Sequence, residues 1–326
     1  AQRGTSSTSS GFYTVDRFQV NFTGTNEAPT QAQVALSSSD TPYSSGFRFA
    51  YKVTNGNQTS GGGAGRFIRY KTTIEAQDMA NSGWNYLSSS SYITLSFWMK
   101  SSVAQDFKGY IRSYDGTDQR YSFATGSLSA DTWTKITKTI PGNSSIQIDN
   151  DSGNGFEVVL GGFWGTDYTD SSVTENAWAA YASGQRMKDN TSTWYTTNDA
   201  TLEITGVQLE VGSQATAFEH RTYAEELKLC QRYYEQFTPK LLILARYSHH
   251  DGAPYRQHFF KTEKRAAPTC SSSGTFVDSS GYAGNPSFSD TSTDFTDIYG
   301  ANTVTAGGIL YLHDSSSALV KFDAEI

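Results

Sequence analysis

The chain has 326 residues, of which 14% are aromatic and only 17% are charged. Together with 29 glycines and three methionines, this mixture favours strands and turns and excludes an all-helical protein. The net charge of −7 is spread without acidic or basic blocks, so the sequence lacks the signature of a nucleic-acid-binding protein. The longest apolar run, residues 241–245, is far shorter than the ~20 residues of a membrane-spanning helix.

Residues 1–10 are small and polar, and we expect them to form a flexible lead. They lack the apolar stretch of a secretory signal. From Gly11 onward, apolar and polar residues alternate in short runs that are separated by Gly, Ser, Asn and Asp clusters. Many such runs without interleaved helices predict an all-β, jelly-roll β-sandwich over residues 11–220. The runs are 16–22, 47–53, 67–74, 93–100, 107–112, 133–140, 156–163 and 201–211.

The last of these runs changes its apolar parity. Leu202 and Ile204 occupy even positions, whereas Val207 and Leu209 occupy odd ones, and Gly206 lies at the change. A β-bulge inserts one extra residue into a strand and shifts the parity in this way. The sequence therefore predicts a bulge at Gly206.

One convincing helix follows, over residues 221–238. Thr222 and Glu225 have the spacing of a capping box, and Pro239 ends the segment. Apolar residues recur at the spacing of a coiled-coil seam over about two heptads. Two interpretations stay open, a helix packed on its own sandwich and a helix that associates with other copies of the chain. The residues of the predicted oligomerisation stripe are Tyr223, Leu227, Cys230, Tyr234 and Phe237.

Residues 239–326 form a segment long enough for a second small β domain. Its predicted strands are 241–247, 257–264, 274–277 and 308–313. The two cysteines, Cys230 and Cys270, cannot form a disulfide framework, and we expect both to be free thiols.

Several segments resemble bacteriophage tail-fibre-type proteins, many of them marine. The segments are 202–213, 215–219, 229–234, 264–269 and 322–326, while 92–100 and 133–135 resemble the carbohydrate-binding jelly roll of such fibres and of glycosidase accessory modules. The resemblance implies a virion appendage with a jelly roll, a connecting helix and a C-terminal β domain. It also implies a homotrimer that contacts other virion structural proteins and is synthesised in the bacterial host cytoplasm.

The segment from Trp164 to Ala200 is too long and irregular for an ordinary loop, and such loops tend to be functional. Its aromatic and acidic residues suit a glycan, because sugar rings present apolar CH faces edged by hydroxyls. The alternative is that these aromatic residues pack the loop onto the sandwich or seal a subunit interface. The candidate glycan-binding residues are Trp164, Asp167, Tyr168, Asp170, Trp178, Tyr181, Trp194 and Tyr195.

No cofactor or metal site is predicted. Residues 149–155 are rich in Asp and Asn but fail the EF-hand pattern and indicate a tight turn. A structural calcium ion elsewhere in the sandwich is compatible with the resemblance, but no residues are assigned to it. His249 and His250 are adjacent and lack further ligand spacing. Glu203 and Glu210 could be imagined as a glycosidase pair, but exposed strand carboxylates are commonplace.

The sequence therefore predicts a non-enzymatic tail fibre or receptor-binding protein of a phage particle that recognises host surface glycans. The first alternative is a passive assembly protein such as a head fibre or adaptor, and the second is a polysaccharide-degrading enzyme. Exposure of Trp164, Trp178 and Trp194 would favour recognition, and their burial between chains would favour assembly.

Overall fold

The computed structural model describes residues 2–238, 242–245, 254–274, 276–278, 284–300, 309–314 and 318–325. It divides into two compact units, residues 3–220 and 221–325, each of which is described here by itself. Among the described residues, no helix is long and apolar enough to cross a membrane.

The first unit contains two six-stranded sheets whose paired strands all run antiparallel. Two short helices, η1 (Thr41–Ser45) and α1 (Ala76–Ala80), lie in the connections. Sheet A has the order β1 (Ser6–Ser7), β3 (Thr30–Ala35), β4 (Phe49–Thr54), β12 (Thr201–Val211), β6 (Tyr92–Ser101), β9 (Thr134–Pro141). Sheet B has the order β11 (Trp178–Ala180), β8 (Gln119–Leu128), β7 (Gln105–Ser113), β10 (Asn154–Trp164), β5 (Phe67–Glu75), β2 (Gln19–Thr23).

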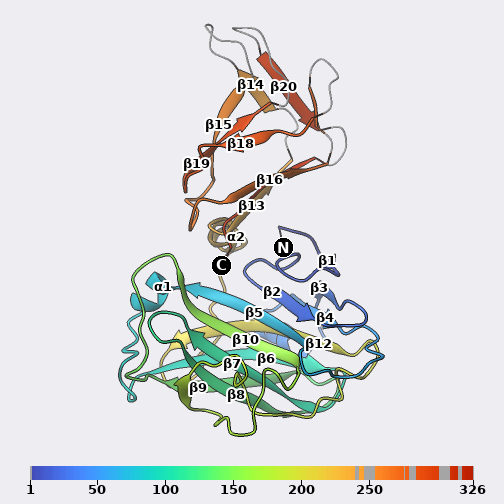
Figure 1. Cartoon of the computed structure of the whole chain (residues 1–326), viewed down its shortest axis with the longest axis vertical. Helices are drawn as coiled ribbons and strands as arrows, with labels where there is room; N and C mark the ends of the chain where they lie inside the picture. Colours follow the sequence, from blue (N-terminus) through green and yellow to red (C-terminus); the bar gives the residue numbers. More distant parts are fainter. Residues whose placement is uncertain are drawn as a thin grey trace. The chain divides into compact units, whose positions relative to one another are not determined.

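The strand order identifies the jelly roll directly (Figure 1). Four strands of sheet A, in the order β4-β12-β6-β9, face four strands of sheet B, in the order β5-β10-β7-β8. Along the chain these eight strands pass back and forth between the sheets, and only β7 and β8 form a hairpin within one sheet. This is the double Greek key of a jelly roll, so the all-β jelly-roll prediction is confirmed.

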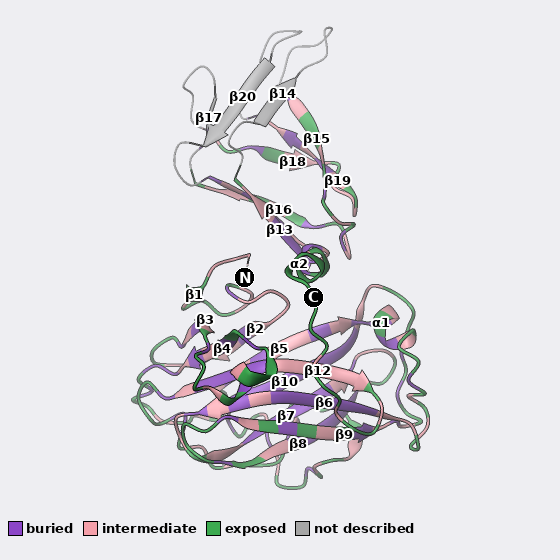
Figure 2. Cartoon of the chain, turned by 180° about the vertical axis from the view of Figure 1, so that it is seen from behind, coloured by how far each residue is buried: buried purple, intermediate pink, exposed green. Residues whose placement is uncertain are grey.

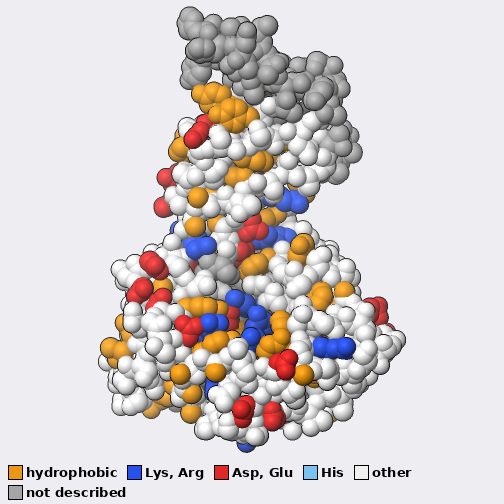
Figure 3. All heavy atoms as spheres, in the orientation of Figure 1, with side chains coloured by type: hydrophobic (Ala, Val, Ile, Leu, Met, Phe, Trp, Pro, Cys, Tyr) orange, Lys and Arg blue, Asp and Glu red, His pale blue; other side chains and the backbone are white. Residues whose placement is uncertain are grey.

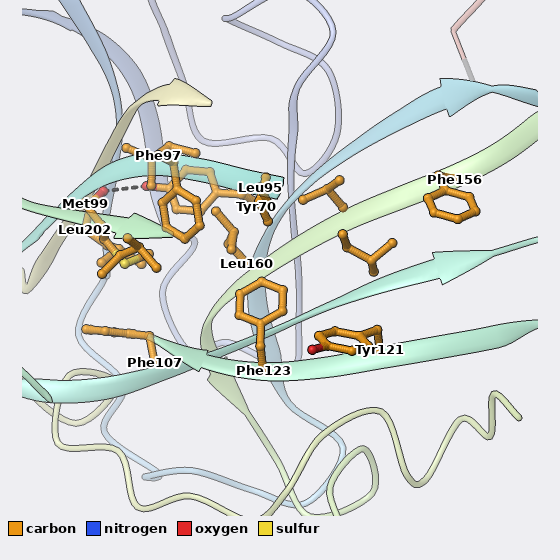
Figure 4. Packing of buried hydrophobic residues seen from close by; sticks show 14 of the residues in the cluster. Tyr70, Leu95, Phe97, Met99, Phe107, Tyr121, Phe123, Phe156, Leu160 and Leu202 are labelled. Atoms are coloured by element: carbon orange, nitrogen blue, oxygen red, sulfur yellow. Dashed lines mark hydrogen bonds between the residues drawn. The ribbon is translucent and has the colours of Figure 1, made fainter. Parts of the chain in front are cut away.

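The core lies between the inner faces of the two sheets. Alternate residues of β6 point inward, and Leu95, Phe97 and Met99 are fully buried there. Figure 4 shows these side chains meeting Phe107 and Phe123 from the opposite sheet. Burial runs along the central strands of both sheets (Figure 2), as expected when each sheet covers the other.

The predicted flexible lead is wrong for part of residues 1–10. Strand β1 pairs with β3, and the side chain of Gln31 donates to the carbonyl of Ser9 at 2.6 Å. These hydrogen bonds use backbone groups that composition alone does not reveal. Strands β3 and β8 were not predicted. The bulge at Gly206 is confirmed, because the register between β12 and β6 shifts between Thr205 and Gln208.

The second unit begins with α2 (Tyr223–Gln231), whose capping box is present as predicted. The helix is shorter than predicted, because the chain enters β13 (Tyr234–Phe237) instead of continuing to residue 238. Pairing of β13 with β21 (Leu319–Asp323) buries Tyr234 and packs Phe237 against Phe322. The predicted stripe is therefore not one helical seam, because its last two members lie on a strand.

Strands form two sheets in the second unit. One has the order β13-β21-β16 (Thr269–Ser273), and Lys264 and Glu235 form an ion pair of 3.0 Å beside it with both side chains buried. The other has the order β17 (Phe276–Asp278), β20 (Ile309–Asp314), β14 (Leu242–Ala245), β15 (Tyr255–Phe259), β19 (Phe295–Tyr299), β18 (Ser287–Ser289). Neither Cys230 nor Cys270 forms a disulfide bond, as predicted. His249 and His250 lie outside the described residues.

Candidate functional site

The outer face of sheet B carries long charged side chains on three neighbouring strands, β10, β7 and β8. Along β10, Phe156, Val158 and Leu160 point into the core, so Glu157 and Val159 point outward. Cross-strand pairing places Glu157 opposite Arg112 of β7, and Arg112 opposite Arg120 of β8.

The predicted aromatic loop folds over this face. Trp164, at the end of β10, is buried with Tyr110, Val159 and Met187 in a cluster separate from the main core. Its indole lies against Gly161, where a Cβ atom would meet the indole Nε1 at 1.7 Å. The glycine therefore makes room for the ring on the sheet surface.

Arginines and tyrosines stack on one another across the face. The guanidinium carbon of Arg112 lies 3.7 Å from the ring centre of Tyr181 and 4.3 Å from that of Tyr114. The guanidinium carbon of Arg186 lies 4.6 Å from the ring centre of Tyr168. Such contacts hold the planar groups of the loop against those of the strands.

Two carboxylates of the face are engaged by cations. Glu157 forms an ion pair of 2.7 Å with Lys71 and accepts a hydrogen bond of 2.6 Å from the hydroxyl of Tyr114. Burial by itself raises the pKa of Glu157, but Lys71 and the hydrogen bond from Tyr114 outweigh burial and hold the pKa below its ordinary value. Asp118 accepts from the guanidinium of Arg112.

We call this surface the arginine–tyrosine face. In space-filling view, Lys and Arg side chains gather with hydrophobic ones in the middle of the jelly-roll unit, over β5 and β10 (Figure 3). Its members are Arg69, Lys71, Tyr110, Arg112, Arg120 and Glu157 from the strands, Tyr114 directly after β7, and Trp164, Tyr168, Tyr181 and Arg186 from the end of β10 and the loop.

The structure brings three of the eight predicted site residues together on this face, namely Trp164, Tyr168 and Tyr181. The prediction is wrong for Trp194 and Tyr195, which are both 0% exposed in the main core. Tyr195 stacks on Phe163 at 4.0 Å. A ring sealed in this way cannot stack on a sugar.

Trp178 is partly buried and packs against one edge of the main core. Its indole nitrogen donates to the carbonyl of Pro141 at 2.6 Å, and its ring lies 5.4 Å from that of Tyr121. Asp167 and Asp170 are on the loop at the surface. The carboxylate of Asp170 accepts from the backbone of Ser172 at 2.8 Å and shapes the loop.

The remaining residues of the face were missed by the sequence argument. The sequence did contain a signal for them on β5, where the charged residues Arg69 and Lys71 alternate with the buried residues Ile68 and Tyr70. Two neighbouring outward positions of β5 therefore carry cations.

A pocket of about 280 Å³ lies on the outer face of sheet A. Phe218 packs there edge-on against Phe47 at 4.8 Å, and His220 Nε2 hydrogen-bonds the carbonyl of Ser45 at 2.8 Å. The residues that line it are Ser45, Phe47, Ser96, Trp98, Lys135, Gly206, Thr216, Ala217, Phe218 and His220.

The described part of the chain contains no group of three or more His, Cys, Asp or Glu side chains that could hold a metal ion. At the predicted turn, the carboxylate of Asp151 accepts from the backbone of Gly153 at 2.8 Å. Glu203 pairs with Lys100 at 3.3 Å, whereas the Glu210 carboxylate accepts from the hydroxyl of Thr216 at 2.6 Å. These two glutamates therefore belong to separate contacts.

No family model matches the chain, and no curated protein matches it. Similar solved structures include the enzymatically active domain of tailspike protein 4 of bacteriophage CBA120, at 11% identity over 60% of this chain and 19% of that chain, with a TM-score of 0.33. This chain therefore spans about a fifth of the tailspike's length. The family 11 carbohydrate-binding module of a Clostridium thermocellum cellulosomal cellulase matches at 12% identity over 64% and 96% of the two chains, with a TM-score of 0.31.

The N-terminal cellulose-binding domain of Cellulomonas fimi β-1,4-glucanase C matches at 10% identity over 66% and 99%, with a TM-score of 0.31. At these scores the jelly-roll assignment rests on the strand order of the chain itself.

Proposed function

We propose that the jelly-roll unit binds a polysaccharide on the arginine–tyrosine face. The observation that carries the proposal is the gathering of partly exposed tyrosine rings with hydrogen-bonding groups on one outer face. Tyr168 and Tyr181 offer apolar ring surface, and the guanidinium groups of Arg112 and Arg186 offer donors beside them. Sugar rings combine apolar CH faces with hydroxyls, so they match this alternation of rings and donors.

The binding is proposed to be non-catalytic. A glycosidase needs one carboxyl group that is protonated near neutral pH to act as the acid. Glu157 has the opposite character, because Lys71 and Tyr114 hold its pKa below its ordinary value. The carboxylate best placed on this face is thus suited to fix side chains and not to donate a proton.

The setting we propose is a phage tail fibre or receptor-binding protein that attaches the particle to a host cell. This part of the proposal rests on the sequence resemblance. A homotrimer would present three copies of the face, and linked copies raise the apparent affinity without new contacts. Weak single sites would then be sufficient for attachment.

The test is the affinity of single variants for polysaccharides extracted from host cells, measured by affinity electrophoresis. We expect Tyr168→Ala and Tyr181→Ala each to weaken binding about tenfold, as for a central aromatic contact residue. Tyr43→Ala is the matched control, because Tyr43 also carries a stacked arginine, Arg48 at 4.0 Å, but packs on the outer face of sheet A.

Equal binding by all three variants and the original chain would place recognition elsewhere. Release of reducing sugar from the bound polysaccharide would contradict the non-catalytic part and favour an enzyme. Absence of binding to every host polysaccharide, with the chain firmly incorporated in particles, would favour the passive assembly protein.

A further inference from the structure

Three arginines of the arginine–tyrosine face have no carboxylate partner among the described residues. Arg69 donates only to the hydroxyl of Tyr110, at 3.1 Å, and its Nε is buried without a hydrogen-bond partner. The Nε of Arg186 is also buried without one. Arg120 is 4% exposed, and its Nε and one Nη lack partners.

Two of these charges share one aromatic neighbour, and the third lies opposite another arginine. The guanidinium carbons of Arg69 and Arg186 both lie 5.8 Å from the ring of Trp164. Arg120 lies directly opposite Arg112 on the neighbouring strand. Like charges in directly opposite positions of a sheet destabilise it, and burial strengthens their repulsion.

The acidic groups beside the three arginines are already engaged. Lys71 and Tyr114 use one oxygen of Glu157, and Arg112 binds Asp118. The other oxygen of Glu157, Oε1, is buried without a hydrogen-bond partner, as is the Nε1 of Trp164. The face therefore contains unused donors around Trp164 and an excess of unpaired positive groups, in a chain whose net charge is −7.

We infer that the arginine–tyrosine face selects an acidic polysaccharide, in which carboxylated sugar rings stack on Tyr168 and Tyr181 and place carboxylates against Arg69 and Arg186. This inference rests on the proposed function of the same face. A guanidinium binds a carboxylate through two parallel, charge-assisted hydrogen bonds, which are about twice as strong as neutral ones. The buried charge of Arg120 adds positive potential beneath the site.

The test compares acidic polymers with their neutral counterparts. Polygalacturonate and alginate are each measured beside the product of carboxyl reduction, which keeps the ring and linkage but removes the charge. We expect at least one acidic polymer to bind ten times or more tightly than its reduced form, as one charge-assisted contact or more is lost. Added salt should weaken binding of the acidic polymer and leave the reduced one little changed.

Single-residue variants test whether Arg186 and Arg69 cause the preference for the acidic polymer. Arg186→Gln and Arg69→Gln should each reduce the preference for the acidic polymer about fivefold or more, with weak binding of the reduced polymer retained. Arg48→Gln is the matched control on the outer face of sheet A and should keep the full preference. Unchanged thermal unfolding of the three variants would show that folding is intact.

The outcomes separate the two proposals. Equal or tighter binding of the reduced polymers would overturn the acidic preference while leaving polysaccharide binding in place. Failure of all four polymers and of host polysaccharides to bind would overturn both. Polyglutamate that binds as tightly as the acidic polysaccharides would show an attraction of charge alone and would also overturn the inference.

Discussion

The cations on the two outer faces of the jelly roll differ in whether they form ion pairs with carboxylates. On sheet A, Lys100 lies 3.3 Å from Glu203 and 3.6 Å from Asp40, and Asp40 also accepts from the indole of Trp133 at 2.8 Å. On the outer face of sheet B, neither Arg69 nor Arg186 forms an ion pair with a carboxylate of the described residues. The inner faces of both sheets are closed and apolar, so the contrast is confined to the outer faces.

The segments that cover the two faces explain the difference. Sheet A is covered by apolar residues from the connections before β4 and after β12, where Leu36, Phe47 and Phe218 pack together. Sheet B is covered by the long loop after β10, which brings tyrosines and Arg186 onto strands that already carry arginines. The outer face of sheet A thus pairs its central lysine, whereas the outer face of sheet B keeps arginine donors without a hydrogen-bond partner among the described residues.

The largest expected effect is the loss of the buried ion pair of sheet B. Lys71→Met leaves Glu157, which is 2% exposed, without its ion-pair partner, and breaking such a pair typically costs about 3–5 kcal/mol of unfolding free energy. Urea denaturation measures it. Lys135→Met, which changes an exposed lysine of sheet A, should alter stability by less than about 0.5 kcal/mol. A cost for Lys71→Met no larger than the ~1 kcal/mol of an exposed pair would contradict the interpretation.

A smaller loss of unfolding free energy is expected when one glycine on each outer face is replaced by alanine. Gly206→Ala introduces a Cβ 2.4 Å from the Phe47 ring at a φ of +61°, and we expect a loss of about 2–4 kcal/mol from strain and overpacking. Gly161→Ala moves the indole of Trp164 and should cost about 1–3 kcal/mol. Thermal unfolding compares the two variants, and polysaccharide binding should fall only in Gly161→Ala. Loss of binding in Gly206→Ala alone would place the site on sheet A.

The smallest effect concerns acid stability. The Ser37 backbone amide and the Trp133 indole donate to Asp40 and lower its pKa to about 2, outweighing burial. A lowered pKa stabilises the fold above the ordinary value near ~3.9 and ceases to do so as the pH falls toward 2. Asp40→Asn should therefore be less stable than the original chain at neutral pH, with the difference shrinking between about pH 4 and pH 2. Melting temperatures across this range measure it, and a constant difference would refute the assignment.

Much of the first unit, and the start of α2 in the second, followed from local sequence pattern. Alternation placed most of the strands, parity identified the bulge at Gly206, and the capping residues Thr222 and Glu225 located the start of α2. These features depend on neighbours in the sequence, which act through backbone geometry and short-range hydrogen bonds. The end of α2 was not predictable in the same way, because pairing with the distant strand β21, where Tyr234 lies opposite Asp323, decides that Tyr234 lies in a strand.

For the site, the sequence determined that an aromatic loop follows β10 and that Tyr168 and Tyr181 belong to it. Only the tertiary structure decided which of its rings face solvent, because Trp194 and Tyr195 find space between the sheets while Trp164 finds it over Gly161. The tertiary structure also decided which charged side chains form ion pairs. Whether an arginine contacts a carboxylate depends on strand register and on the segment that covers the sheet. Neither can be predicted from the residues next to that arginine in the sequence.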